Sequence, residues 1–137
     1  MSALSDILRK QAGGRVAWWC PGCDEAHAIP VEGAGAWGWN GNADAPTFTP
    51  SVKVSGFKLT PAGEALLLKD QADGTRRGDG FTYDRVATVC HAIVTDGLIA
   101  FCGDSTHGLA GQTVIIPFWP DSFEGVAGQS DTETGTP

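Results

Sequence analysis

The sequence lacks a cluster of basic residues. Its nine Lys and Arg residues are outnumbered by sixteen Asp and Glu residues, which gives a net charge of −7. The densest basic spot, Arg76-Arg77, is flanked by Asp73 and Asp79. A protein that binds DNA or RNA needs a positively charged surface to displace counterions from phosphates. We therefore expect no nucleic-acid partner.

Long apolar runs are also missing. No stretch approaches the roughly 18 apolar residues of a transmembrane helix, and the charged N-terminus has no apolar run typical of a signal peptide. We therefore expect a soluble, cytoplasmic protein with no membrane contact. Thiols stay reduced in the cytoplasm, so the four cysteines indicate metal ligands rather than disulfides.

Glycine and aromatic residues are plentiful: 19 Gly, five Trp and six Phe among 137 residues. Short apolar runs separated by glycines favour short strands joined by tight turns. We predict a β-rich α+β domain over residues 15–120, with a small twisted sheet or sandwich, a zinc knuckle and one or two short helices. An N-terminal helix or arm over residues 1–14, with Ser5 as its cap, and a disordered acidic tail over residues 121–137 complete the chain.

Two segments carry strong local signals. Thr60 is a suitable N-cap, and a proline at the first helical position follows it, which predicts a helix over residues 61–72. Two apolar runs flank Asp96-Gly97, a favoured pair for a type I′ turn. This pattern predicts a β-hairpin over residues 86–102.

The Cys20-Pro-Gly-Cys23 spacing is typical of a zinc knuckle, in which the small turn lets both sulfurs face one ion. A knuckle supplies two of four ligands. The remaining candidates are Cys90, Cys102, His27, His91 and His107.

The predicted hairpin helps to sort these candidates. With a two-residue turn, His91 pairs with Cys102, and Cys90 points to the opposite face. The Cys90 face is otherwise apolar and should be the core. We predict one structural Zn²⁺ held by Cys20, Cys23, Cys90 and His107. Replacement of one of these ligands by His91, His27 or Cys102 remains an alternative.

A redox function competes with metal binding. Trp19-Cys-Pro-Gly-Cys23 is typical of thioredoxin-type oxidoreductases, in which the first cysteine begins a long helix. Here Pro30 and the glycines after it leave no room for that helix. We therefore favour metal binding.

A second group of polar residues surrounds the end of the hairpin. His91, Cys102 and Asp104 project from one face, and a carboxylate beside a histidine can orient the imidazole. We expect His91 to donate a hydrogen bond to Asp104 in a structural role. The alternative is a zinc-dependent hydrolase that uses His91, Asp104 and His107 around a metal-bound water. His91 and Asp104 are therefore candidate catalytic residues, and neither is assigned.

Several motifs occur in a characteristic order. They are Cys-Pro-Gly-Cys…His, Trp-x-Trp-Asn-Gly, Pro-Thr-Phe-Thr-Pro-Ser, Cys-His-x-Ile-Val-x-Asp-Gly and Asp-Ser-Thr-His-x-Leu-Ala-Gly-Gln. This combination, over about residues 17 to 117, resembles a family of small phage and prophage proteins of unknown function, some mislabelled ammonia monooxygenase. The resemblance implies a phage or prophage origin. It also implies that the family's signature positions are Cys20, Cys23, Cys90, His91 and His107.

The function expected from these observations is that of a non-enzymatic binding module directed at a host or virion protein. Trp37, Trp39, Phe118 and Trp119 are candidate aromatic anchors for that partner, although core packing is the alternative for at least half of them. If the protein is phage-encoded, its expected location is the host-cell cytoplasm, with the virion as a second location.

Overall fold

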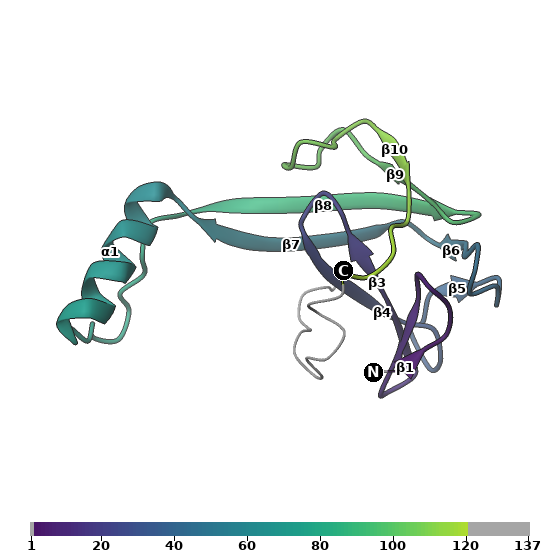
Figure 1. The fold of residues 1–137 in the computed structure, drawn as a ribbon, viewed down its shortest axis with the longest axis horizontal. Helices are drawn as coiled ribbons and strands as arrows, with labels where there is room; N and C mark the ends of the chain where they lie inside the picture. The colour runs from purple at the N-terminus through teal and green to yellow at the C-terminus, as the bar shows by residue number, and fades with distance from the viewer. Residues whose placement is uncertain (1, 121–137) are drawn as a thin grey trace. The chain divides into compact units, whose positions relative to one another are not determined.

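The computed structural model describes residues 2–120 and is β-rich, with three small antiparallel sheets and one helix in that range (Figure 1). The elements are β1 (Ser2–Ala3), β2 (Arg9–Gln11), β3 (Arg15–Cys20), β4 (Glu25–Pro30), β5 (Gly38–Trp39), β6 (Phe48–Thr49), β7 (Val52–Leu59), α1 (Pro61–Asp73), β8 (Arg85–Thr95), β9 (Leu98–Phe101) and β10 (Thr113–Ile115). The predicted β-rich α+β class is confirmed. The predicted acidic tail over residues 121–137 lies outside the described residues.

The chain forms two compact units. Among the described residues, one comprises residues 2–55 and 89–120, and the other comprises residues 56–88. The first unit contains every residue of the candidate sites described below.

The first sheet has the strand order β1-β2-β3-β4. Its centre is the β3–β4 hairpin, in which Trp18 pairs with His27 and Cys20 pairs with Glu25. Because side chains alternate along a strand, Trp18, Cys20 and their two partners share one face. The turn of this hairpin is the Cys-Pro-Gly-Cys segment, so the knuckle sits at one end of the sheet.

The second sheet has the order β10-β9-β8-β7. Its β8–β9 hairpin turns at Asp96 and Gly97, whose φ angles are 50° and 80°. Two positive φ values are required by a type I′ turn, and this explains the choice of residues. Ala92 pairs with Phe101, and the Cys102 amide donates to the His91 carbonyl at 2.8 Å. The predicted hairpin and its register are confirmed.

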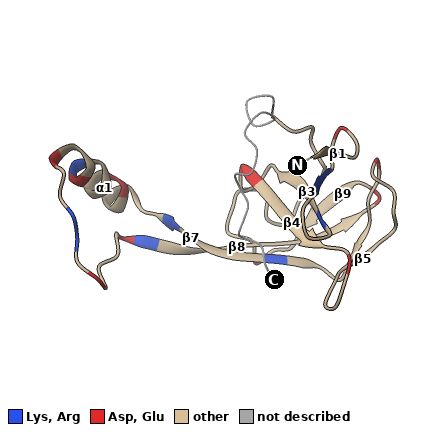
Figure 2. Ribbon diagram, turned by 90° about the horizontal axis from the view of Figure 1, so that it is seen from below, with Lys and Arg blue, Asp and Glu red and all other residues tan. Residues whose placement is uncertain are grey.

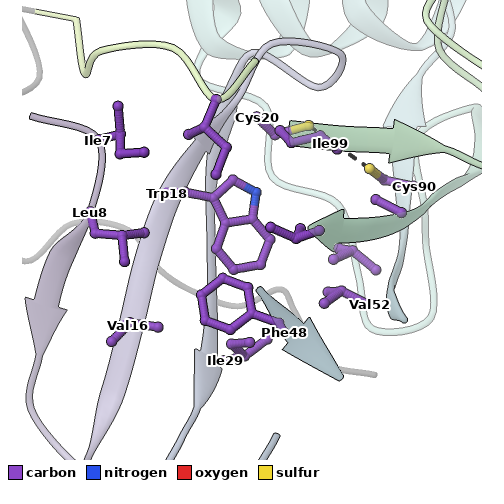
Figure 3. Close-up of a cluster of buried hydrophobic side chains, with 14 of the residues drawn as sticks. Ile7, Leu8, Val16, Trp18, Cys20, Ile29, Phe48, Val52, Cys90 and Ile99 are labelled. Atoms are coloured by element: carbon purple, nitrogen blue, oxygen red, sulfur yellow. Dashed lines mark hydrogen bonds between the residues drawn. The ribbon is translucent and has the colours of Figure 1, made fainter. Parts of the chain in front are cut away.

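The core of the first unit is built from residues of all three sheets, the third of which pairs β5 with β6 (Figure 3). Trp18 stacks on Phe48 with their ring centroids 5.4 Å apart. The hairpin face predicted to be core is buried along its length, and its members are Cys90, Ala92, Val94, Ile99 and Phe101. This packing fixes which side chains of β8 point inward.

The predicted N-terminal helix is wrong. Residues 2–11 form β1, a turn and β2, and the Ser5 hydroxyl accepts hydrogen bonds from the amides of Ile7 and Leu8. Leu8 is fully buried, whereas Leu4 is 39% exposed, so the apolar residues do not share a helical face. Pairing of β2 with β3 gives the backbone groups of residues 9–11 hydrogen-bond partners, and Leu8 beside them is buried. An isolated helix of this length is only marginally stable in water, so these contacts decide the structure of the segment.

The second unit contains α1, which confirms the predicted helix over residues 61–72. The Thr60 hydroxyl accepts a hydrogen bond from the Gly63 amide, and Gly74 ends the helix in the left-handed conformation. Asp70, with a side chain only 4% exposed, accepts two hydrogen bonds from the Arg77 guanidinium and one from the Tyr83 hydroxyl. This polar cluster ties the loop after α1 to the helix.

Basic and acidic residues are interspersed in this unit (Figure 2). Lys69 lies 2.8 Å from Asp73, and Arg77 is paired with Asp70. Pairing of this kind leaves little net positive field for a phosphate backbone. No helix in the described part of the chain has the length and apolar character needed to cross a membrane.

The Asp70 cluster predicts a pH-dependent stability of α1. Hydrogen bonds from Arg77, and then from Tyr83, lower the pKa of Asp70 below its ordinary value. The ionised carboxylate therefore stabilises the folded unit above its unfolded pKa, and this contribution is lost as the pH falls through the folded pKa. Asp70→Asn should lower the protection of α1 amides from hydrogen exchange at pH 7, and the difference from the native chain should vanish in acid.

Amide hydrogen exchange measured by NMR at pH 7 and in acid tests the prediction. Asp73→Asn is the control, because Asp73 belongs to an exposed ion pair with Lys69. Equal protection of α1 in Asp70→Asn and the native chain at pH 7 would contradict it.

Candidate functional site

The four predicted metal ligands lie together. Cys20 ends β3, Cys23 lies in the following turn, Cys90 lies on β8, and His107 lies in the loop after β9. One ligand atom from each lies within 4.8 Å of the others. The sulfurs of Cys20 and Cys90, which are 70 residues apart in the sequence, are 3.8 Å apart (Figure 3).

The turn geometry of the knuckle brings its two sulfurs together. The Cys23 amide donates to the Cys20 sulfur at 3.4 Å, and the Asp24 amide donates to the Cys20 carbonyl at 2.8 Å. Gly22 has no side chain, and a Cβ at this position would overlap the His107 imidazole. The glycine is therefore required to let the ring approach the cysteines.

The geometry fits a tetrahedral metal ion. Zn–S bonds of about 2.3 Å at a tetrahedral angle place two sulfurs about 3.8 Å apart, which matches the Cys20–Cys90 distance. The His107 Nε2 atom is buried and has no hydrogen-bond partner among the described residues. The Leu109 amide donates to the other ring nitrogen at 3.2 Å. Ligation through Nε2 would give this buried atom a partner. It would also place the ring proton on Nδ1, so the Leu109 amide would lose its acceptor.

Each of the three thiols affects the ionisation of the others. Hydrogen bonds from Cys23, and then Cys90, hold the pKa of Cys20 far below its ordinary value. The interaction with Cys20 raises the pKa of Cys23 to about 12 and raises the pKa of Cys90 as well. Ionisation of Cys20 therefore opposes ionisation of Cys23 and Cys90. A divalent ion would let all three thiols ionise, since its charge offsets their mutual repulsion.

The other candidate ligands are not part of this group of four. His27 is grouped with Cys23 and Glu25, and Cys102 is grouped with His91 and Asp104. The zinc-hydrolase hypothesis required His107 beside His91 and Asp104, but His107 belongs to the cysteine cluster. The cluster could hold a metal ion, and its identity as zinc stays a prediction.

A second site lies on the outer face of the β8–β9 hairpin. The His91 Nδ1 atom lies 3.1 Å and 3.2 Å from the two carboxylate oxygens of Asp104. Its Nε2 atom lies 3.0 Å from the Ser51 hydroxyl. With the ring proton on Nδ1 and donated to Asp104, Nε2 is free to accept the hydroxyl proton. This serine–histidine–aspartate arrangement is the geometry of a nucleophile, its base and an orienting carboxylate.

The loop that carries Asp104 is held firmly against β8. The Ser105 hydroxyl accepts from the His91 amide and donates to the His91 carbonyl, both at 3.1 Å. The Thr106 amide donates to the Val89 carbonyl at 2.8 Å, and the Val89 amide donates to the Thr106 hydroxyl at 3.0 Å. These bonds fix the relative positions of His91 and Asp104.

The proximity of His91 and Asp104 agrees with the prediction from the hairpin face. Ser51 was missed. It is the last residue of the Pro-Thr-Phe-Thr-Pro-Ser motif, and no glycine-flanked nucleophile pattern marks it. Its carbonyl accepts a hydrogen bond from the Trp37 indole at 3.3 Å. The motif itself was the available signal, but it did not identify the serine as a reactive group.

The predicted aromatic anchors are mostly packed inside. Trp37 and Trp39 are partly buried against the core, and Trp119 is buried, with its indole donating to the Ile7 carbonyl at 3.0 Å. Phe118 is 71% exposed. Core packing therefore accounts for three of the four, and Phe118 alone of them is available to a partner.

The contact between Gly22 and His107 predicts a sensitive position in the metal cluster. Gly22→Ala should weaken Zn²⁺ binding about tenfold or more, the size typical when a group supporting a metal site is changed, because the new Cβ displaces the imidazole. Gly108→Ala is the matched control, since a Cβ there meets no atom within 4 Å. Competition against a chromophoric chelator measures both, and equal affinities would contradict the expected contact.

Comparison with known proteins identifies one family. Residues 3–102 match BubE, described as a bacterial ubiquitination-like system serine protease. The match includes Ser51 and His91 and ends just before Asp104. No curated protein and no solved structure matches the chain. Because the match covers well over half of its residues, the chain belongs to the BubE family of bacterial ubiquitination-like system serine proteases.

Proposed function

We propose that this protein is a serine peptidase in which Ser51 is the nucleophile, His91 is the general base and Asp104 orients the imidazole. The observation that carries the proposal is the continuous chain of hydrogen-bond distances from the Ser51 hydroxyl through His91 to Asp104. The description of the BubE family as a serine protease supports a serine nucleophile.

The chemistry follows from the positions of these three groups. Ser51 Oγ attacks the acyl carbon of the scissile bond while its proton passes to His91 Nε2. The carboxylate of Asp104 stabilises the resulting imidazolium. His91 then gives the proton to the leaving amine, and the acyl group stays on Ser51. In the second half, His91 takes a proton from water, the hydroxide releases the acyl group, and the proton returns to Ser51.

The surroundings of the site favour a macromolecular substrate. The side chains of His91 and Asp104 are 27% and 51% exposed, so the reacting groups lie at an open surface. An open site can receive an extended protein segment, whereas small ligands are usually enclosed. We propose that the substrate is a protein of a bacterial ubiquitination-like system, cleaved at an amide or isopeptide bond.

The metal has a structural role in this proposal. Cys20, Cys23, Cys90 and His107 would hold one Zn²⁺ with four protein ligands, which leaves no position open for substrate. When bound, the ion would link the β3–β4 hairpin, β8 and the loop after β9 at fixed positions. Cys90 directly precedes His91, and His107 follows Asp104 by three residues. The link therefore supports the backbone on both sides of the His91–Asp104 contact.

Cys102 is the competing nucleophile, because it belongs to the same group as His91 and Asp104. The Ser51 hydroxyl, however, is the group within hydrogen-bond distance of Nε2, the nitrogen that remains free when Nδ1 is paired with Asp104. We therefore assign the nucleophile to Ser51.

A non-enzymatic module that binds a host or virion protein, in a phage or prophage setting, is the second candidate function. The highly exposed Phe118 favours it, because exposed aromatic residues commonly anchor protein partners. In that case, the serine–histidine contact would be structural, and Ser51 would show no unusual reactivity.

Ser51→Ala tests the assignment. We expect the native chain to be labelled at Ser51 by a fluorophosphonate and to hydrolyse an activated acyl ester. Ser51→Ala should lose labelling and at least about 10³-fold in kcat/KM. Cys102→Ser is the matched control and should retain both. Mass spectrometry of the labelled peptide locates the modified residue. A native chain that resists the reagent would reject the peptidase and favour the binding module.

Asp104→Asn should separate the orienting carboxylate from the nucleophile. The amide cannot stabilise an imidazolium and does not fix the ring proton on Nδ1, so kcat should fall about 10²- to 10⁴-fold. Zn²⁺ content and the thermal unfolding temperature should stay close to those of the native chain, since Asp104 is half-exposed. Asp44→Asn serves as the control on another surface loop. Unchanged kcat in Asp104→Asn would rule out the proposed triad.

A further inference from the structure

His27 is an unusual residue in the interior of the first unit. Its side chain is 2% exposed. Neither ring nitrogen lies within hydrogen-bond geometry of a described residue, although the ring is near enough to Cys20 to lower the pKa of that thiol. The ring packs edge-on against Trp18, with the ring centroids 6.2 Å apart. Buried polar groups are normally satisfied, so both nitrogens require an explanation.

The groups around His27 are metal ligands in type. His27 and Glu25 are two residues apart on β4 and therefore project to the same face, with Nδ1 of the imidazole 3.9 Å from a Glu25 carboxylate oxygen. This distance is too long for a hydrogen bond. Cys23 completes a group in which one ligand atom from each residue lies within 4.8 Å of the others.

Charge also favours a second cation here. One divalent ion in the cluster of Cys20, Cys23, Cys90 and His107 leaves the three thiolates with a residual negative charge. The carboxylate of Glu25 has an oxygen within 4.8 Å of the Cys23 sulfur and adds another negative charge. Two divalent ions would balance three thiolates and one carboxylate.

We propose that Cys23, Glu25 and His27 form a second metal site, which shares the Cys23 thiolate with the first ion. Thiolate, imidazole and carboxylate together are the donors that Zn²⁺ accepts, and a thiolate sulfur has lone pairs for two metal ions. Three protein ligands leave one position of a tetrahedron for water. The site gives a ring nitrogen of His27 the partner that it lacks.

The stoichiometry of Zn²⁺ tests this proposal. The full chain, loaded with Zn²⁺ and passed through a desalting column, is analysed for metal per chain by mass spectrometry. We expect two ions in the native chain and one in His27→Ala. Glu25→Gln should bind the second ion at least tenfold more weakly in a chelator competition and should leave the first unchanged. Because Glu25 is half-exposed, this variant decides the matter even if His27→Ala fails to fold.

His91→Ala is the matched histidine control, because His91, Cys102 and Asp104 are another group that could hold a metal. It should retain two ions, and a drop to one would place the second ion there and overturn the proposal. A single ion in the native chain would overturn it too. In that case His27 serves only to stabilise the charge on Cys20, with which it interacts. Loss of both ions in a folded His27→Ala chain would instead make His27 a ligand of the first ion.

Discussion

The pairing of residue 91 with residue 102 across the β8–β9 hairpin is the constraint on which both sites depend. It directs Cys90 into the core, where its sulfur meets Cys20, and directs His91 outward, where its ring lies between Ser51 and Asp104. Neighbouring strand residues point to opposite faces, so a slip of one residue would exchange the two. The type I′ turn at Asp96-Gly97 and the buried apolar face oppose such a slip.

The loop after β9 serves both sites at once. Asp104 faces the outer side of the hairpin, and His107 reaches the cysteine cluster on the inner side. The hydrogen bonds of Ser105 and Thr106 to β8 hold the segment between them. Any metal that binds His107 therefore acts on the same short loop that presents the carboxylate to His91.

The two sites differ in burial in a way that suits their chemistry. Cys20 and Cys90 are nearly inaccessible, which protects thiolates from oxidation and strengthens their attraction to a cation. His91 and Asp104 are partly exposed, which the proposed peptidase would need in order to reach a protein substrate. The cysteine–histidine cluster and the serine–histidine–aspartate group therefore occupy adjacent residues of β8 without sharing a side chain.

Local chemistry was enough to predict the elements with strong turn or cap signals. Asp96-Gly97 predicts the hairpin because few residue pairs tolerate two positive φ angles. Thr60 predicts α1 because its hydroxyl satisfies a free amide of the first turn. The prediction of an N-terminal helix failed because its apolar pattern was weak, and residues 9–11 pair with β3 instead. The knuckle and the face of Cys90 follow from spacing and strand periodicity, and so the cysteine–histidine cluster could be anticipated.

The serine–histidine–aspartate group could not be anticipated in full. His91 and Asp104 are 13 residues apart on one hairpin and its following loop, and strand alternation is enough to bring them together. Ser51 is 40 residues from His91 and precedes β7, and nothing in its local sequence says that it faces the hairpin. By itself, the sequence determined the turns, the register and the residues of one cluster, because these depend on local backbone preferences and side-chain alternation. Only the tertiary structure decided that Ser51 meets His91, because that contact depends on how β7 is placed beside β8.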